Sequence, residues 1–226
     1  QQVHAAGFQV AIHAIGDRGN HESLDAIAFG QQGDPSHRHR LEHAQLLADD
    51  DLPRLAALGV VASMQPTHAT SDMRWAQDRV GPTRLAGAYA WRRVLASGAI
   101  LAFGSDSPIE GISPALGIYA ALTRQDAAGF PSGGWLPDQR LDVAQALAAF
   151  GSGAAYAVHE EDRHGNLEIG QQLDLTVFDH DPTDSADLWL SAEPVATIVD
   201  GTVELLIVAG RTRVQPPARG HDEGNP

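Results

Sequence analysis

The sequence predicts an α/β protein in which a parallel sheet is followed by a small β domain. Short apolar runs alternate with helical segments through residues 1–160, which is the pattern of consecutive strand–helix units. From residue 161 this pattern stops, and short segments of alternating apolar and polar residues begin. These observations leave open whether the parallel sheet is doubly wound or part of a barrel.

Four strands are expected in the first part, because each run is too short for a helix. They cover residues 8–13, 38–43, 60–65 and 99–103. The expected helices cover residues 21–29, 49–58, 91–97, 113–124 and 141–150. Residues 1–7 have the pattern of a helix end closed by Gly7, and residues 66–90 that of a long connection.

The second part, residues 161–213, has the alternation typical of half-buried strands. Residues 173–179 alternate strictly, and Asp200-Gly201 separates two further runs, which predicts a β-hairpin. Residues 214–226 are rich in Pro and Gly and are expected to form a disordered tail. We therefore expect residues 1–160 and 161–213 to form separate domains.

Composition excludes several classes of function. The net charge of −14 argues against a nucleic-acid partner, because phosphate contacts need clustered cations. No apolar run approaches the roughly 20 residues that span a bilayer, so no membrane partner is expected. The chain has no Cys, and its 15 basic residues are all Arg. Thiolate and Lys chemistry are thus excluded within this chain, and a metal would need His, carboxylate or backbone oxygen ligands.

Three of the four expected strands end in a side chain that can bind a metal. These residues are His13, His43 and Asp106. In parallel α/β folds, and most regularly in barrels, active sites lie at the carboxyl ends of the strands. Two imidazoles and a carboxylate at one edge suit zinc or a similar divalent ion.

Each of these residues also has an ordinary structural interpretation. A single His at a strand end is often only hydrogen-bonded there, and Asp106 is also placed to cap a following helix. Asp17 is similarly placed to cap a helix, and Glu42 to pair with Arg40. The occurrence of three potential ligands at three strand ends favours the metal site.

Four motifs carry a resemblance to a known family. They are His13-Ala14-Ile15-Gly16-Asp17, Leu41-Glu42-His43-Ala44-Gln45, Met64-Gln65-Pro66-Thr67-His68 and Gly104-Ser105-Asp106-Ser107-Pro108. In this order they resemble the amidohydrolase superfamily, and most closely its amidohydrolase 3 branch of metal-dependent hydrolases, which includes N-substituted formamide deformylases. The resemblance implies strands five to eight of a distorted TIM barrel, joined near Gly165–Val177 to strands of a small β-sandwich.

The resemblance also implies roles for single residues. His13, His43 and Asp106 would bind one or two divalent ions, zinc above all, and Asp106 would move the proton during hydrolysis of an amide or N-formyl C–N bond. Asp17 and Glu42 would orient the imidazoles. The residues expected to contact a small-molecule substrate are Gln65, His68 and Trp75.

Other features expected of that family are missing from this sequence. The His-x-His pair of the first strand and the bridging acid or modified Lys of a middle strand are absent. We therefore expect this chain to be a fragment that is inactive alone and that has the missing N-terminal half or a second copy as its partner. We also expect it to be cytoplasmic. Two alternatives stay open: a non-catalytic fragment or scaffold, and a nucleotide- or sugar-binding α/β module, for which Gly16-Asp17-Arg18-Gly19 is a poor phosphate loop.

Overall fold

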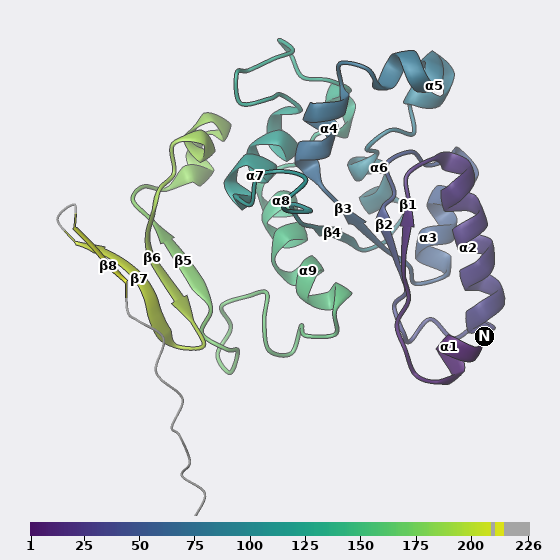
Figure 1. Ribbon diagram of the computed structural model, residues 1–226, viewed down its shortest axis with the longest axis horizontal. Coiled ribbons are helices and arrows are strands. Elements are labelled where there is room, and N and C mark those ends of the chain that lie inside the picture. The colour runs from purple at the N-terminus through teal and green to yellow at the C-terminus, as the bar shows by residue number, and fades with distance from the viewer. Residues whose placement is uncertain (209–210, 215–226) are drawn as a thin grey trace, which may run out of the picture. The chain divides into compact units, whose positions relative to one another are not determined.

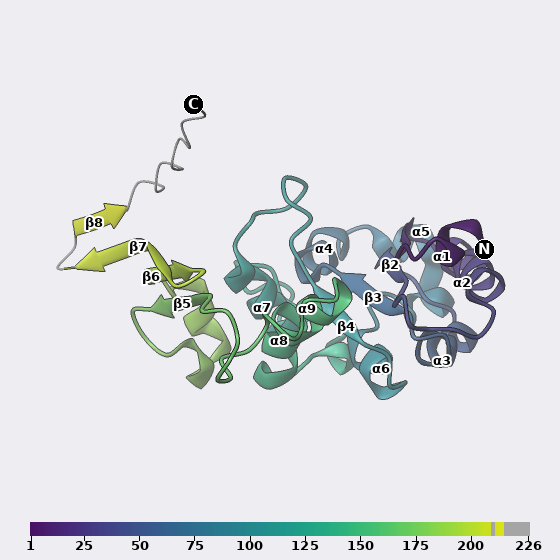
Figure 2. The ribbon, with the colours of Figure 1, turned by 90° about the horizontal axis from the view of Figure 1, so that it is seen from below.

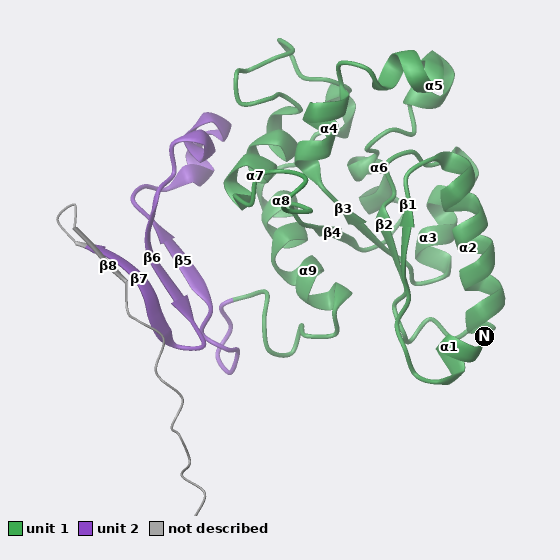
Figure 3. Ribbon diagram, in the orientation of Figure 1, with its two compact units in different colours: residues 1–166 green, residues 167–226 purple. Residues whose placement is uncertain are grey.

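The structure, a computed structural model, describes residues 1–208 and 211–214, with side chains described up to residue 207. The chain divides into two compact units, residues 1–166 and 167–226 (Figure 3). The expected tail lies outside the described residues from residue 215 onward. No helix in the described ranges is long and apolar enough to cross a membrane.

Unit 1 is built on a parallel sheet of four short strands (Figure 1). They are β1 (Ala11–Ala14), β2 (Arg40–His43), β3 (Val61–Met64) and β4 (Leu101–Phe103). Each strand pairs with the next one in the chain, and the order β1-β2-β3-β4 contains no reversal. This confirms the predicted parallel α/β arrangement and places all four carboxyl ends at one edge.

Helices connect the strands and bury one face of the sheet. α2 (Asp17–Gln31) and α3 (Leu52–Ala57) lie on the same side of the sheet in Figures 1 and 2, and α6 (Trp91–Ala96) packs on β4. The Trp91 ring meets the Phe103 ring edge-on, with centroids 5.5 Å apart. Burying each large apolar side chain contributes about 1.5–3 kcal/mol, so this packing stabilises unit 1.

Two of the helices that follow β4 pack against it. α8 (Val143–Phe150) begins with a capping box, in which Asp142 and Gln145 satisfy each other's backbone N–H groups. α9 (Ser152–Ala157) ends at the amino-terminal edge of the sheet, where the Ala157 carbonyl accepts hydrogen bonds from Gln9 and Arg40. Unit 1 also contains α1 (Gln2–Ala5), α7 (Pro114–Thr123), and the 3₁₀ helices η1 (Asp49–Asp51) and η2 (Pro137–Gln139).

Residues 66–90 were expected to form a long connection. The structure shows that two helices lie within it. α4 (Pro66–Asp72) starts directly after Gln65, and α5 (Ala76–Leu85) follows it with a kink at Gly81. Pro66 lies at the first helical position, where its fixed φ favours a helix start and its missing N–H costs no hydrogen bond. Pro66 therefore ends the strand by opening a helix.

Unit 2 contains an antiparallel sheet of four strands. They are β5 (Leu175–Phe178), β6 (Pro194–Val199), β7 (Thr202–Val208) and β8 (Arg211–Val214), with η3 (Pro182–Asp184) and η4 (Ala186–Leu190) between β5 and β6. The predicted hairpin is confirmed. Asp200 and Gly201 have φ of 49° and 72°, the left-handed values that tight hairpin turns need.

A buried histidine joins α1 to the sheet at its amino-terminal edge. His39 is 4% exposed and accepts a hydrogen bond at Nδ1 from the backbone N–H of Val10 (3.0 Å). Its Nε2 lies 3.2 Å from Nδ1 of His4 on α1. Burial lowers the pKa of His39, and the neighbouring His4 and His37 lower it further, so His39 is neutral in the folded chain.

We predict that acid destabilises unit 1 through His39. An unfolded His has a pKa of about 6.5, so the unfolded chain takes up this proton before the folded chain does, and stability falls as the pH drops through that value. Thermal unfolding between about pH 7.5 and 5.5 should show this loss. His39→Gln, whose amide oxygen can still accept from Val10, should show a shallower pH dependence; an equal slope in both proteins would contradict the prediction.

Candidate metal centre

The end of β2 presents one nitrogen of His43. The Nδ1–H of His43 donates to Oε1 of Gln65 (2.9 Å), since an amide oxygen only accepts. Gln65 is 6% exposed and lies between β3 and α4. His43 has a φ of 76° and Ala44 a φ of 43°, so the chain turns sharply where the strand ends. This arrangement leaves the Nε2 lone pair of His43 free to bind a metal.

His68 contributes a second nitrogen from the first turn of α4. Its side chain is buried, and among the described residues its Nε2 has no hydrogen-bond partner. Nε2 lies 3.6 Å from Oδ2 of Asp106, and the His68 ring stacks on the His43 ring with centroids 5.7 Å apart. Burial lowers the pKa of His68, which favours the neutral form that binds metals. A buried, unpartnered nitrogen beside a carboxylate fits a cation.

Asp106 completes a group of three. One potential ligand atom from each of His43, His68 and Asp106 lies within 4.8 Å of the other two. β4 ends at Phe103 and Asp106 has a φ of 57°, so Asp106 lies in a turn three residues beyond the strand. The alternative role as a helix cap was wrong, because the next helix starts at Pro114. Nitrogen and carboxylate oxygen donors of this kind suit zinc.

His13, at the end of β1, lies beside this group. Its side chain is exposed, and its ring meets the His43 ring edge-on, with centroids 4.5 Å apart. His13 and His68 thus lie next to His43 on two sides. The structure brings His13, His43 and Asp106 to one edge of the sheet, as the sequence predicts, and adds His68, which was expected only to contact substrate.

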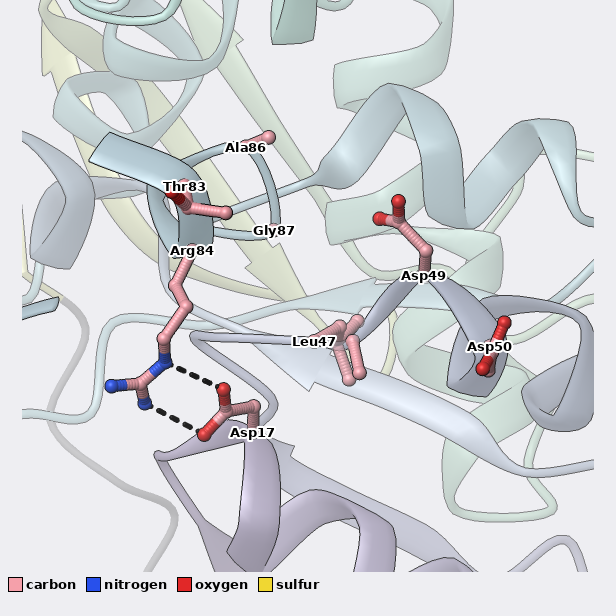
Figure 4. A pocket seen from close by; sticks show the side chains of 9 residues that line it. Asp17, Leu47, Asp49, Asp50, Thr83, Arg84, Ala86 and Gly87 are labelled. Carbon is pink, nitrogen blue, oxygen red and sulfur yellow. Dashed lines mark hydrogen bonds and ion pairs between the residues drawn. The ribbon is translucent and has the colours of Figure 1, made fainter. Parts of the chain in front are cut away.

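The two acids expected to orient the imidazoles have arginine partners. Glu42 pairs with Arg40 at 2.8 Å. Asp17, at the start of α2, accepts two hydrogen bonds of 2.7 Å from Arg84, as Figure 4 shows. Arg84 holds the pKa of Asp17 below its usual value. Among the described residues, neither Asp17 nor Glu42 makes the predicted hydrogen bond to a histidine.

Sequence reasoning missed a polar network next to the metal site. Asp72, at the end of α4, accepts hydrogen bonds from the Gln45 amide (2.8 Å) and from the Tyr89 hydroxyl. Gln45 lies in the second motif, but its partners come from segments far away in sequence. Trp75 follows α4, is 49% exposed, and lines the same pocket as these residues.

A second group of potential ligands, His4, Asp34 and His37, lies at the opposite edge of the sheet. Because Val10 donates to Nδ1 of neutral His39, that ring carries its proton on Nε2 and directs it at Nδ1 of His4. His4 must then keep its own proton on Nε2, which faces Asp34. A protonated nitrogen cannot bind a metal, so the group at the carboxyl edge is the better candidate.

The sequence is similar to a known protein family. The model of the amidohydrolase family matches residues 1–205. The chain belongs to the amidohydrolase family. This confirms the resemblance predicted from the four sequence motifs.

Individual relatives show how much of a family member the chain represents. YtcJ of Bacillus subtilis is 34% identical over 87% of this chain and 37% of YtcJ. N-substituted formamide deformylase of Arthrobacter pascens is 29% identical over 87% of this chain and 36% of that enzyme. The crystal structure of a metal-dependent hydrolase from Pyrococcus horikoshii matches with a TM-score of 0.70 and 36% identity, covering 81% of this chain and 36% of that chain. The chain thus spans about a third of these proteins.

We predict that Gln65→Leu weakens zinc binding roughly 10–100-fold, the usual effect of removing a residue that orients a metal-bound histidine. Leucine cannot accept the His43 Nδ1–H, so Nε2 is no longer held toward the site. Isothermal titration with zinc measures the affinity. Gln65→Glu retains an acceptor and is the matched control; a Leu variant that binds zinc as tightly as the Glu variant would contradict this role.

Proposed function

We propose that the chain carries the metal centre of a hydrolase that cleaves an amide or N-formyl C–N bond, with zinc as the metal. The observation that carries this proposal is the buried, unpartnered Nε2 of His68 beside the Asp106 carboxylate and the His43 ring. The residues that would hold the ion are His43 and Asp106, with His13 and His68 on either side of His43.

The residues of the site divide the chemistry between them. A divalent ion held there would polarise the substrate carbonyl and lower the pKa of an attacking water from about 15.7 toward about 7. Asp106 accepts the proton of that water and delivers it to the leaving nitrogen, acting first as base and then as acid. Gln65 fixes the His43 ring, and the partly exposed Trp75 forms a wall for the substrate.

The substrate class is supported by one relative. N-substituted formamide deformylase is 29% identical to this chain, and its name describes removal of a formyl group from a substituted nitrogen. We propose a small N-acyl or N-formyl amine as substrate. A nucleotide-binding function is less well supported, because the carboxylate of Asp17 occupies the first turn of α2, where a phosphate would bind.

We also propose that activity needs further protein. Among the described strands, β1 and β4 have one neighbour each, so no strand covers their outer edges, although α9 packs against the Leu101 carbonyl at the edge of β4. The consecutive order of the strands is that of a barrel segment. The remainder of a family barrel, or a second copy of the chain, would cover these edges and supply further metal ligands.

We predict that Asp106→Asn, made in the protein at its full natural length, lowers kcat roughly 10²–10⁴-fold, because asparagine cannot take the proton from water. Zinc analysis of the same protein by mass spectrometry should show that part of the metal is retained. Hydrolysis of N-formyl and N-acyl amines at a near-normal rate by this variant would remove Asp106 from the mechanism.

Metal removal tests the proposal separately. We predict that treatment with a chelator abolishes hydrolysis of the same amines and that added zinc restores it, because the proposed chemistry needs a metal to polarise the carbonyl and to activate the water. Hydrolysis that continues in a protein shown to be metal-free would exclude the proposed chemistry.

A further inference from the structure

Tyr89 connects the two segments of the chain that carry His43 and His68. Its backbone N–H donates to the carbonyl of Gln45 (2.7 Å), which follows His43 by two residues. Its side-chain hydroxyl donates to Asp72, which follows His68 by four residues on α4. The Gln45 amide donates to the same carboxylate (2.8 Å), so the side chains of Gln45, Asp72 and Tyr89 form one hydrogen-bonded cluster.

The backbone contacts hold the loop that follows β2. This loop starts at His43 and Ala44, whose left-handed φ values are unfavourable for residues other than glycine. Residues 45–47 pair with residues 87–89 through backbone hydrogen bonds of 2.7 and 3.0 Å and through an antiparallel bridge between them. This short ladder fixes the chain immediately after the strained turn, and with it the position of the His43 ring.

The side-chain contact holds α4. This helix has only 7 residues, with His68 in its first turn and Asp72 at its end. Residues four apart lie one above the other on a helix, about 6 Å apart along its axis, so a displacement of Asp72 also displaces His68. Burial raises the pKa of the Tyr89 hydroxyl, and the hydrogen bond to Asp72 raises it further. The hydroxyl therefore stays protonated and acts as the donor.

Tyr89 itself is fixed by buried residues. Its carbonyl accepts a hydrogen bond from Nη1 of Arg124 (3.1 Å). Arg124 is 1% exposed, and its guanidinium lies over the Trp91 ring, 4.1 Å from the ring centroid. The Tyr89 ring meets the rings of Trp91 and Trp135 edge-on, with centroids 6.4 and 5.8 Å apart. These contacts make Tyr89 a fixed point that reaches both segments of the site.

From these contacts we propose that Tyr89 is a positioning residue of the metal centre, which sets the spacing between His43 and His68. It does so by holding the loop after β2 through its backbone and α4 through its hydroxyl. The rings of the two histidines stack with centroids 5.7 Å apart. Distances between a metal and its ligands vary by only about 0.2 Å, so a small shift of one ring weakens binding. The inference rests on the proposed metal centre.

Tyr89→Phe tests this role, because it removes the hydroxyl and keeps the ring and the backbone hydrogen bonds. In the protein at its full natural length, the affinity for zinc measured by isothermal titration should fall roughly 10- to 100-fold. The absorption spectrum of cobalt(II) bound in place of zinc should also change, because it reports the arrangement of the ligands. A role in stability alone would lower the unfolding temperature and leave the cobalt spectrum of the folded protein unchanged.

Tyr119→Phe is the matched control, because it makes the same change in another buried tyrosine, which lies on α7 outside the cluster. It should bind zinc as the wild type does. Asp72→Asn separates position from charge: the asparagine oxygen still accepts from Tyr89, so the affinity should fall less than in Tyr89→Phe. Zinc affinity and a cobalt spectrum unchanged in Tyr89→Phe, or a loss of affinity in Asp72→Asn alone, would overturn the inference.

If the full-length wild type binds no zinc, the proposed metal centre fails, and crystal structures decide the role of Tyr89 separately. Without metal, the separation of the His43 and His68 ring centroids should be close to 5.7 Å in the wild type and in Tyr119→Phe. It should be larger in Tyr89→Phe, because α4 is no longer tied at Asp72. An unchanged or smaller separation in Tyr89→Phe would overturn the inference.

Discussion

The parallel pairing of four consecutive strands is the constraint on which the candidate site depends. Because β1 to β4 run in the same direction, residues that follow each strand meet at one edge of the sheet. His13 and His43 lie at the ends of their strands, Asp106 follows β4 by three residues, and His68 lies in the first turn of the helix after β3. The helices that pack on the sheet stabilise this arrangement, so residues away from the site help to bring its polar atoms together.

The site carries backbone strain and a burial cost, of kinds that also occur elsewhere in unit 1. His43, Ala44 and Asp106 adopt left-handed backbone conformations, which cost non-glycine residues about 1–3 kcal/mol each. His68 adds a buried nitrogen without a partner. A cation would offset the second cost by giving that nitrogen and the nearby carboxylate a shared ligand. The same reasoning separates this group from His4, Asp34 and His37, where a chain of hydrogen bonds already satisfies the rings.

Much of the fold could be predicted from residue patterns, and the exceptions have identifiable causes. The apolar runs predicted all four parallel strands, and Asp200-Gly201 predicted the hairpin, because these signals are local. The helix that begins at Pro66 was missed, since proline was taken only as the end of a strand. That miss hid the place of His68 in the ligand group. The partnership of Asp72 with Gln45 and Tyr89 joins distant segments and has no local signal.

The central claim is that the carboxyl edge of the sheet binds a divalent ion. Anomalous X-ray diffraction from crystals grown with zinc tests it most directly. The account predicts a peak roughly 2.0–2.2 Å from Nε2 of His43 and from a carboxylate oxygen of Asp106, with His68 or His13 next in the coordination shell. Zinc bound only at His4, Asp34 and His37, or no peak at the carboxyl edge at saturating zinc, would contradict it.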